Sequence, residues 1–240
     1  MVVSDLNDLI TAVKKHWCLE NRRKTYFRGH ACREWKLEPS CQRKPHHIHD
    51  DEQLFNYWLC HSAPYLKLDE YHSNRPLELL AIAQHHGLPT RLMDWTFSPL
   101  VAAYFACKEQ FSSDASIWIF KRAQPDNFKT IGVMSHNSVI RVNGIERDLV
   151  TFMPTHNNLR LNAQEGLFTV HCKPKLPFEQ LISKEDELVE LVIPSDSKRQ
   201  LLTDLDMCGI TTRKLFPDLD GVATEIKEMN QLMHLYDENV

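Results

Sequence analysis

The chain has 240 residues, of which 42% are hydrophobic and 25% charged, and its formal net charge is −4 at pH 7. This composition predicts one ordinary globular domain over residues 1–240 and excludes a strongly basic nucleic-acid-binding protein. No apolar run is long enough to span a bilayer, so we expect no membrane association.

The first half of the sequence predicts helices around one short strand. Ser4 is a candidate N-cap for a helix whose apolar face includes Ile10. Ser98 followed by Pro99 is typical of a helix start. The expected order is a helix over 4–17, a strand over 25–28, a loop over 32–45, helices from about 50 and 76, an extended segment over 89–96 and a helix over 98–111.

The second half predicts mainly strands, followed by two helices. Gly209 is expected to end the first of these helices. The apolar patterns indicate strands over 115–122, 138–142, 148–153, 166–172 and 187–193, and helices over 197–208 and about 216–233. Helices before strands favour an α+β fold over a regular βαβ alternation.

The stretch "TYFRGHA" places Arg28 at the end of the first strand, directly before Gly29. An arginine at this point either ties two loops together or holds an anionic ligand through its fork of donors. Gly29 allows a bend or the close approach of a ligand to the backbone.

The segment "AQHHGLPTRLMDWTFSPLVAAYFA", residues 83–106, gathers polar side chains at a turn between two helices. Such junctions often line a pocket. Each residue also has a structural interpretation: Asp94 can cap the next helix or pair with Arg91, and His86 and Trp95 can be core residues. The polar and aromatic candidates are His85, His86, Thr90, Arg91, Asp94, Trp95 and Thr96.

Four stretches together resemble the landmarks of the FRG domain family, which is named for a Phe-Arg-Gly triplet. They are "YFRG", the segment 83–106, "AQEGLFTV" and "GITTRKLFPDLDG", so the resemblance covers about 25–227 and leaves 1–24 as an N-terminal helix. The family setting implies a cytoplasmic toxin or phage-defence effector, with a possible antitoxin or other neutralising partner.

The order of these landmarks is also similar to that of ADP-ribosyltransferases. This second resemblance implies a split β-sheet core, helices in the N-terminal half and at the C-terminus, and NAD as co-substrate. Arg28 and Gly29 would then meet the NAD phosphates and Thr90 the ribose, with Arg91 beside Thr90 in the second landmark, and Gln164 or Glu165 would match the late-strand position at the scissile bond. Tyr26, Trp95, Tyr104 or Phe105 would enclose the nicotinamide, and His86 would line the same pocket.

The third landmark departs from the ADP-ribosyltransferase pattern, because Gln164 and Glu165 are adjacent and point to opposite faces of a strand. The FRG landmark favours Gln164, but a glutamine cannot act as a general base. The catalytic carboxylate is then either Asp94 or missing. The structural alternative for Gln164 is a hydrogen bond that ties a strand end to a loop.

Three further features have structural interpretations that we consider stronger. The cluster "HHIHD", His46–Asp50, lacks a second ligand pair at zinc spacing, which favours a solvated loop. The acids of "KLFPDLDG" suit the first turn of a helix. Basic residues from Arg22 to Lys44, with Trp35, could guide an RNA strand but more commonly form a solvated face.

The leading hypothesis is therefore an ADP-ribosyltransferase-like enzyme that modifies a protein or a nucleic acid. Its alternatives are a non-catalytic module that binds a nucleotide or nucleic acid, and a metal-dependent nuclease or hydrolase built on His85, His86 and Asp94. Seven scattered cysteines without a Cys-x-x-Cys pair favour reduced thiols in the cytoplasm.

Overall fold

The computed structural model describes residues 1–46, 50–66, 76–124, 140–142, 145–154 and 159–237. The helices are α1 (Leu6–Val13), α2 (Asp51–Ser62), α4 (Pro76–His85), α5 (Pro99–Cys107), α6 (Leu159–Ala163), α7 (Phe178–Leu181), α8 (Lys198–Met207), α9 (Thr212–Leu215) and α10 (Leu219–Asp237), with 3₁₀ turns η1 (Ser40–Gln42) and η3 (Ser195–Ser197). The strands are β1 (Thr25–His30), β2 (Leu92–Thr96), β3 (Ala115–Lys121), β4 (Ile140–Val142), β5 (Ile145–Arg147), β6 (Leu149–Phe152), β7 (Gly166–His171) and β8 (Glu187–Ile193). None of the described helices has both the length and the apolar character needed to cross a bilayer.

Local signals set several helix ends. The Ser98 hydroxyl accepts a hydrogen bond from the Val101 amide at the start of α5, and Gly209 has a φ of 74° just after α8. One expectation was wrong: α1 is capped by Asp5 rather than Ser4, and Ile10 is 41% exposed instead of facing the core. The sequence also missed the short elements α6, α7, α9 and β5, which hold too few residues to show a period.

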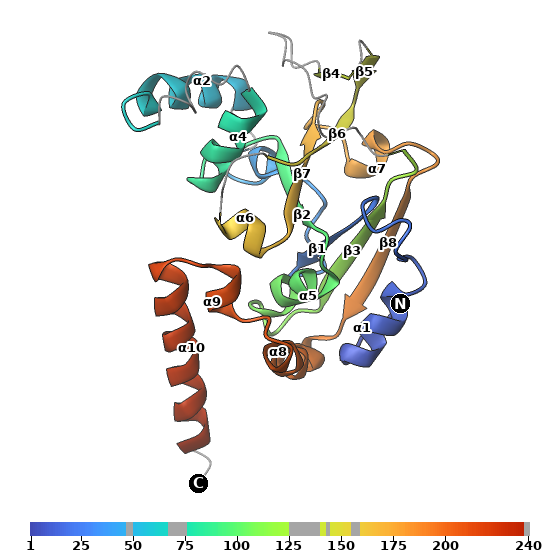
Figure 1. Cartoon of the computed structure of the whole chain (residues 1–240), viewed down its shortest axis with the longest axis vertical. Coiled ribbons are helices and arrows are strands. Elements are labelled where there is room, and N and C mark those ends of the chain that lie inside the picture. Colours follow the sequence, from blue (N-terminus) through green and yellow to red (C-terminus); the bar gives the residue numbers. More distant parts are fainter. Residues whose placement is uncertain (47–49, 67–75, 125–139, 143–144, 155–158, 238–240) are drawn as a thin grey trace.

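Six strands form one antiparallel sheet in the order β6-β7-β2-β1-β3-β8, and β4 and β5 form a separate hairpin (Figure 1). The six-stranded sheet is antiparallel throughout, and the helices between its strands follow no regular βαβ pattern, so the α+β class is confirmed. The likeness to the ADP-ribosyltransferase fold stays a prediction.

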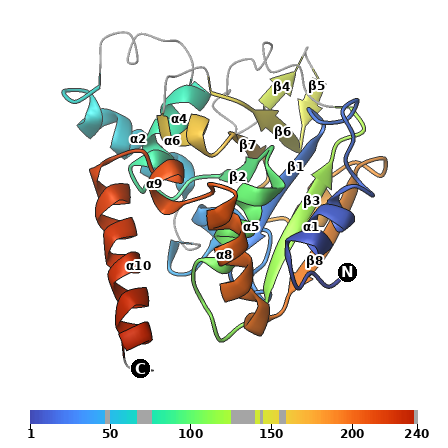
Figure 2. The ribbon, with the colours of Figure 1, turned by 60° about the horizontal axis from the view of Figure 1, so that its bottom comes forward.

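Different helices cover different parts of the sheet. Residues of α1, α5 and α8 pack with β1, β3 and β8 on one face, as Figure 2 shows for α5 and α8. Residues of α2 and α4 pack with β2, β6 and β7. The opposite face is covered partly by α7, whose Phe178 packs with Tyr26 of β1 and Trp95 of β2. The sheet therefore has two halves with separate helical covers, and β1 and β2 lie at their boundary.

The boundary between β1 and β2 is barely paired. The two strands share a single partner pair, Phe27 with Thr96, whereas β1 pairs with β3 along its whole length. The Arg122 amide donates to the Lys24 carbonyl, which makes these two residues a hydrogen-bonded pair of the β1–β3 ladder. Hydrogen-bonded pairs alternate along an antiparallel ladder, so the even-numbered residues of β1 bond to β3. The N–H and C=O groups of the odd-numbered residues therefore point toward β2. Beyond Phe27 the strands separate, and the sheet opens along this seam.

Candidate functional site

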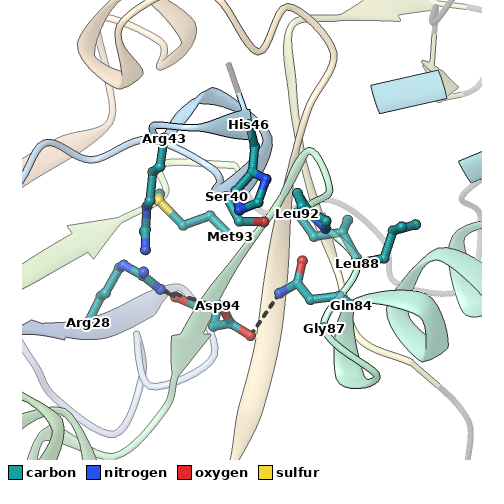
Figure 3. Close-up of a pocket in the computed structure, with 11 residues that line it drawn as sticks. Arg28, Ser40, Arg43, His46, Gln84, Gly87, Leu88, Leu92, Met93 and Asp94 are labelled. Carbon is teal, nitrogen blue, oxygen red and sulfur yellow. Dashed lines mark hydrogen bonds and ion pairs between the residues drawn. The ribbon is translucent and has the colours of Figure 1, made fainter. Parts of the chain in front are cut away.

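A pocket of about 210 Å³ lies where the seam opens (Figure 3). Strands β1 and β2 form its floor, the segment around η1 forms one wall, and the end of α4 with the following Gly/Pro turn forms the other. Its lining residues are Arg28, Ser40, Arg43, His46, Gln84, Gly87, Leu88, Pro89, Leu92, Met93 and Asp94. The pocket thus joins the first-strand arginine to the Gly/Pro junction, two features that the sequence singled out separately.

The Arg28 side chain lies where β1 and β2 would otherwise continue their backbone pairing. In the register set by Phe27 and Thr96, the next hydrogen-bonded pair would be Gly29 with Asp94, but the pairing does not continue to it. Instead, Nη1 of Arg28 donates to the Asp94 carbonyl oxygen at 2.5 Å. The guanidinium therefore lies in the gap between the strands, where it satisfies a backbone acceptor that β1 leaves unpaired.

Arg43 faces Arg28 across the pocket (Figure 3). Its Nε and Nη2 both donate to the Glu38 carbonyl, at 3.2 and 3.1 Å, while Nε of Arg28 donates to Nε2 of His30 at 3.1 Å. Within the described part of the chain, Nη2 of Arg28 and Nη1 of Arg43 have no hydrogen-bond partner. Two fixed guanidinium groups thus each leave one terminal nitrogen for a ligand.

The charges of the pocket favour an anion. Burial lowers the pKa of Arg28 to about 10; the charge of Asp94 opposes this shift and the charge of Arg43 adds to it. At pH 7 Arg28 therefore remains a cation. Among the described residues that line the pocket, Asp94 is the one acidic residue, against two arginines. This imbalance leaves a site with net positive charge.

The Asp94 carboxylate stands at the mouth of the pocket. Its side chain is 65% exposed, while that of Arg28 is 13% exposed. One oxygen, Oδ1, accepts a hydrogen bond of 3.0 Å from the Gln84 side-chain amide, and Oδ2 lies 3.8 Å from Nη1 of Arg28. The Asp94 carboxylate is thus presented to solvent beside the Arg28 guanidinium.

Residues 23–115 match the family model of the FRG domain. This part of the chain is an FRG domain. The match confirms the resemblance for this range, which contains all of the described residues that line the pocket. No curated protein and no solved structure matches the chain. The wider range of about 25–227 stays a prediction.

The glycine of the FRG triplet has a packing role. A Cβ atom on Gly29 would lie 2.0 Å from the Ala102 carbonyl oxygen and 2.6 Å from the Ala106 nitrogen, so only glycine lets α5 pack this closely on β1. Arg28, one residue earlier, points away from α5 because neighbours on a strand alternate sides. Gly29 does not line the pocket, although its backbone groups are directed toward the open seam.

Two further predicted residues of the FRG domain lie behind the pocket wall. Arg91 is 3% exposed and binds the Asp51 carboxylate through Nε and Nη2, at 2.7 and 3.0 Å, and Glu52 through Nη2 at 3.0 Å. It therefore ties β2 to α2. Thr90 is 1% exposed, and its hydroxyl donates to the Gln84 side-chain oxygen. Neither residue lines the pocket.

The remaining predicted site residues lie elsewhere. Gln164 and Glu165 lie in the turn between α6 and β7 rather than on a strand, and the Gln164 side chain donates to the carbonyl of Leu215, the last residue of α9, at 3.0 Å. Gln164 therefore has a structural role, but it ties a turn to a helix end rather than a strand end to a loop. Trp95 is buried and donates from its indole to Thr169, and the Tyr104 hydroxyl bonds to Thr212. His86 is exposed beside His85. The structure thus brings Arg28 and Asp94 together, but does not bring Gln164, Trp95, Tyr104 or His86 into the pocket.

Sequence reasoning missed four polar pocket residues. They are Ser40, Arg43, His46 and Gln84. Arg43 stood within the basic stretch, His46 opened the histidine cluster, and Gln84 belonged to the quoted segment, but no local pattern places them opposite Arg28. The described residues offer no group of three His, Cys, Asp or Glu able to hold a metal ion; residues 47–49 of the histidine cluster lie outside that part of the chain.

Proposed function

We propose that the pocket of the FRG domain binds the diphosphate of a nucleotide, that this nucleotide is NAD, and that the protein transfers ADP-ribose to a macromolecule. The observation that carries the proposal is the convergence of Arg28 and Arg43, each with a terminal nitrogen left for a ligand. Hydrogen bonds from charged guanidinium nitrogens to phosphate oxygens are short and strong, and two arginines that converge can each donate one to the same phosphate group.

Asp94 supplies the carboxylate that this reaction needs. The bond between the ribose C1′ and the nicotinamide nitrogen breaks, and nicotinamide leaves with the bonding electron pair as a neutral molecule. Positive charge develops on the ribose, which a nearby carboxylate stabilises. A nucleophile of the acceptor then bonds to C1′ and loses its proton to water. The 65% exposure of the Asp94 side chain leaves room for such an acceptor.

A second candidate is a module that binds a nucleotide without consuming it. A volume of about 210 Å³ is below the roughly 300–1,000 Å³ typical of ligand pockets, so only part of a dinucleotide fits inside. Gln164, expected at the scissile bond, hydrogen-bonds the Leu215 carbonyl instead. These two observations support a site for a single phosphate-bearing group, which needs no catalytic residue.

Binding of ADP-ribose, measured by calorimetry, tests the phosphate site. We expect Arg43→Gln to weaken binding at least tenfold, because it removes a charged hydrogen-bond donor worth about 1.5–3 kcal/mol. Arg33→Gln is the matched control, because Arg33 bonds both oxygens of Glu190 outside the pocket. Failure of the folded wild-type protein to bind either ADP-ribose or NAD would refute the proposal.

Turnover separates the two candidates. The protein is incubated with NAD labelled on the adenylate part and with cell extract, and nicotinamide release and label transfer are measured. We expect wild type to show both, and Asp94→Asn to lose both while it keeps its affinity for ADP-ribose. Binding without nicotinamide release would favour the non-catalytic module.

The biological setting of the proposal rests on the family resemblance. It is a toxin or phage-defence effector that acts in the cytoplasm on a protein or RNA, with a neutralising partner such as an antitoxin. Identification of the labelled acceptor in the extract, followed by protease or ribonuclease treatment, tests which class of macromolecule is modified.

A further inference from the structure

We propose that Gln84 is a positioning residue that fixes the orientation of the Asp94 carboxylate. This role rests on the proposed function of Asp94 at the scissile bond. Gln84 lies in the last turn of α4, ten residues before Asp94, and its Nε2 is 3.0 Å from Oδ1 of Asp94. Figure 3 shows this contact and the Arg28 contact on opposite sides of Asp94.

The direction of the Gln84 amide follows from hydrogen-bond chemistry. An ionised carboxylate only accepts hydrogen bonds, so the NH₂ end of Gln84 must face Asp94. The oxygen end then faces Thr90, whose hydroxyl donates to it. The same hydroxyl accepts from the Leu92 amide at 3.1 Å. Thr90 thus selects one of the two possible orientations of the amide.

Thr90 is itself held in place. It is 1% exposed, its amide donates to the Ser40 hydroxyl at 3.0 Å, and its carbonyl accepts from the Cys41 amide at 3.1 Å. A chain of hydrogen bonds therefore runs from η1 through Thr90 and Gln84 to Asp94. It links the wall that carries Arg43 to the carboxylate at the mouth of the pocket.

The consequence is a fixed carboxylate at an exposed position. A 65% exposed aspartate would otherwise sample several rotamers. With Oδ1 bound to Gln84, Oδ2 is directed to the Arg28 side of the pocket, 3.8 Å from Nη1. Fixed orientation favours the transition state without changing substrate binding, so loss of Gln84 should lower kcat and leave KM unchanged.

The first test measures kcat and KM for nicotinamide release. Gln84→Met keeps the length of the side chain but donates no hydrogen bond, and we expect kcat to fall about tenfold while KM stays within about twofold of wild type. The matched control is Gln200→Met, since Gln200 also donates to an aspartate, Asp204, at 2.9 Å on an exposed helix surface. An unchanged kcat, a rise in KM alone, or the same loss in the control would overturn the proposal.

Substitution of Thr90 tests the selection of the amide orientation. Thr90→Val removes the hydroxyl at nearly constant volume and should lower kcat as Gln84→Met does. Thr90→Ser keeps the hydroxyl and should restore most of the rate. If kcat of Thr90→Ser is as low as that of Thr90→Val, packing rather than the hydroxyl is responsible. This result would overturn the proposed role of the Thr90 hydroxyl in orienting the Gln84 amide.

An NMR measurement separates failure of this inference from failure of the proposed function, because it needs no turnover. The side-chain amide signal of Gln84, assigned by its loss in Gln84→Met, should shift when Asp94→Ala removes its acceptor. Asp204→Ala should shift the Gln200 signal instead. If the Gln84 signal does not shift in Asp94→Ala, the proposal is overturned. If the signal shifts but wild type releases no nicotinamide, only the proposed enzymatic activity is refuted.

Discussion

Two buried histidines beside Arg28 make the stability of this protein sensitive to acid. His30 is 2% exposed and His171 is fully buried. The pKa of each is lowered to about 3, mainly by burial and further by the charge of Arg28; Arg43 adds to the shift of His30. Both rings are therefore neutral in the folded protein at pH 5.

The loss of stability can be worked out from these shifts. In the unfolded chain a histidine titrates near pH 6.5, so between about pH 6.5 and 3 the unfolded state binds protons that the folded state does not. The stabilisation is complete above the unfolded pKa and is lost as the pH falls toward 3. At pH 5, about 1.5 units below 6.5, each histidine lowers the unfolding free energy by about 2 kcal/mol. Together they remove about 4 kcal/mol, a large share of the 5–15 kcal/mol typical of a domain.

Denaturant unfolding at pH 8 and pH 5, followed by tryptophan fluorescence, measures this effect. The unfolding free energy at pH 8 exceeds that at pH 5, and this excess should be about 2 kcal/mol smaller in His171→Gln than in wild type. It should be about 4 kcal/mol smaller when His30→Gln is added, because glutamine does not titrate. His86→Gln, at an exposed position, controls for the substitution itself. If the double variant keeps the full pH dependence of wild type, the reasoning from burial is wrong.

Three further predictions test the scaffold. Gly29→Ala should lower the unfolding free energy by roughly 3 kcal/mol in urea, because its Cβ would meet backbone atoms of α5 that cannot rotate away; wild-type stability would contradict this. Arg91→Met should lower the unfolding free energy by roughly 3–5 kcal/mol, because it leaves the Asp51 carboxylate buried without its partner. The affinity of the folded fraction for ADP-ribose should not change, and weaker binding would place Arg91 in the site. Burial raises the pKa of the Cys41 and Cys107 thiols to about 12, so both should resist iodoacetamide at pH 8 in the native protein. Mass spectrometry measures the labelling, and labelling at the rate of the exposed cysteines would contradict this prediction.

Local signals predicted most of the fold. The Ser98–Pro99 start and the Gly209 stop act within one helical turn, so they are readable without tertiary context. The strand patterns at β3, β7 and β8 are equally local. One error was itself local: Asp5 rather than Ser4 caps α1, because its carboxylate accepts the Asp8 amide three residues on. The other errors are the short elements α6, α7, α9 and β5, which were missed.

The site was predicted only in part. Arg28 and Asp94 were selected by residue type beside a strand end and a turn, and the structure brings them together. Arg91 carries the same side chain as Arg28 but pairs with α2, and Trp95, which was selected as an aromatic candidate, lies in the core. Residue type identifies candidates for binding an anion, but burial and partners decide which of them remain available.

The sequence by itself determined the α+β class, the FRG landmarks, and the position of Arg28 on a strand directly before a glycine, whereas the reason for that glycine, the backbone of α5 against it, came from the structure. Only the tertiary structure decided that β1 and β2 separate after one pair, so that Arg28 enters the gap and meets Arg43 and Asp94. Helix caps and strand patterns depend on neighbours a few residues away. A pocket instead depends on strand register and on helices packed against each half of the sheet, which bring together residues far apart along the chain.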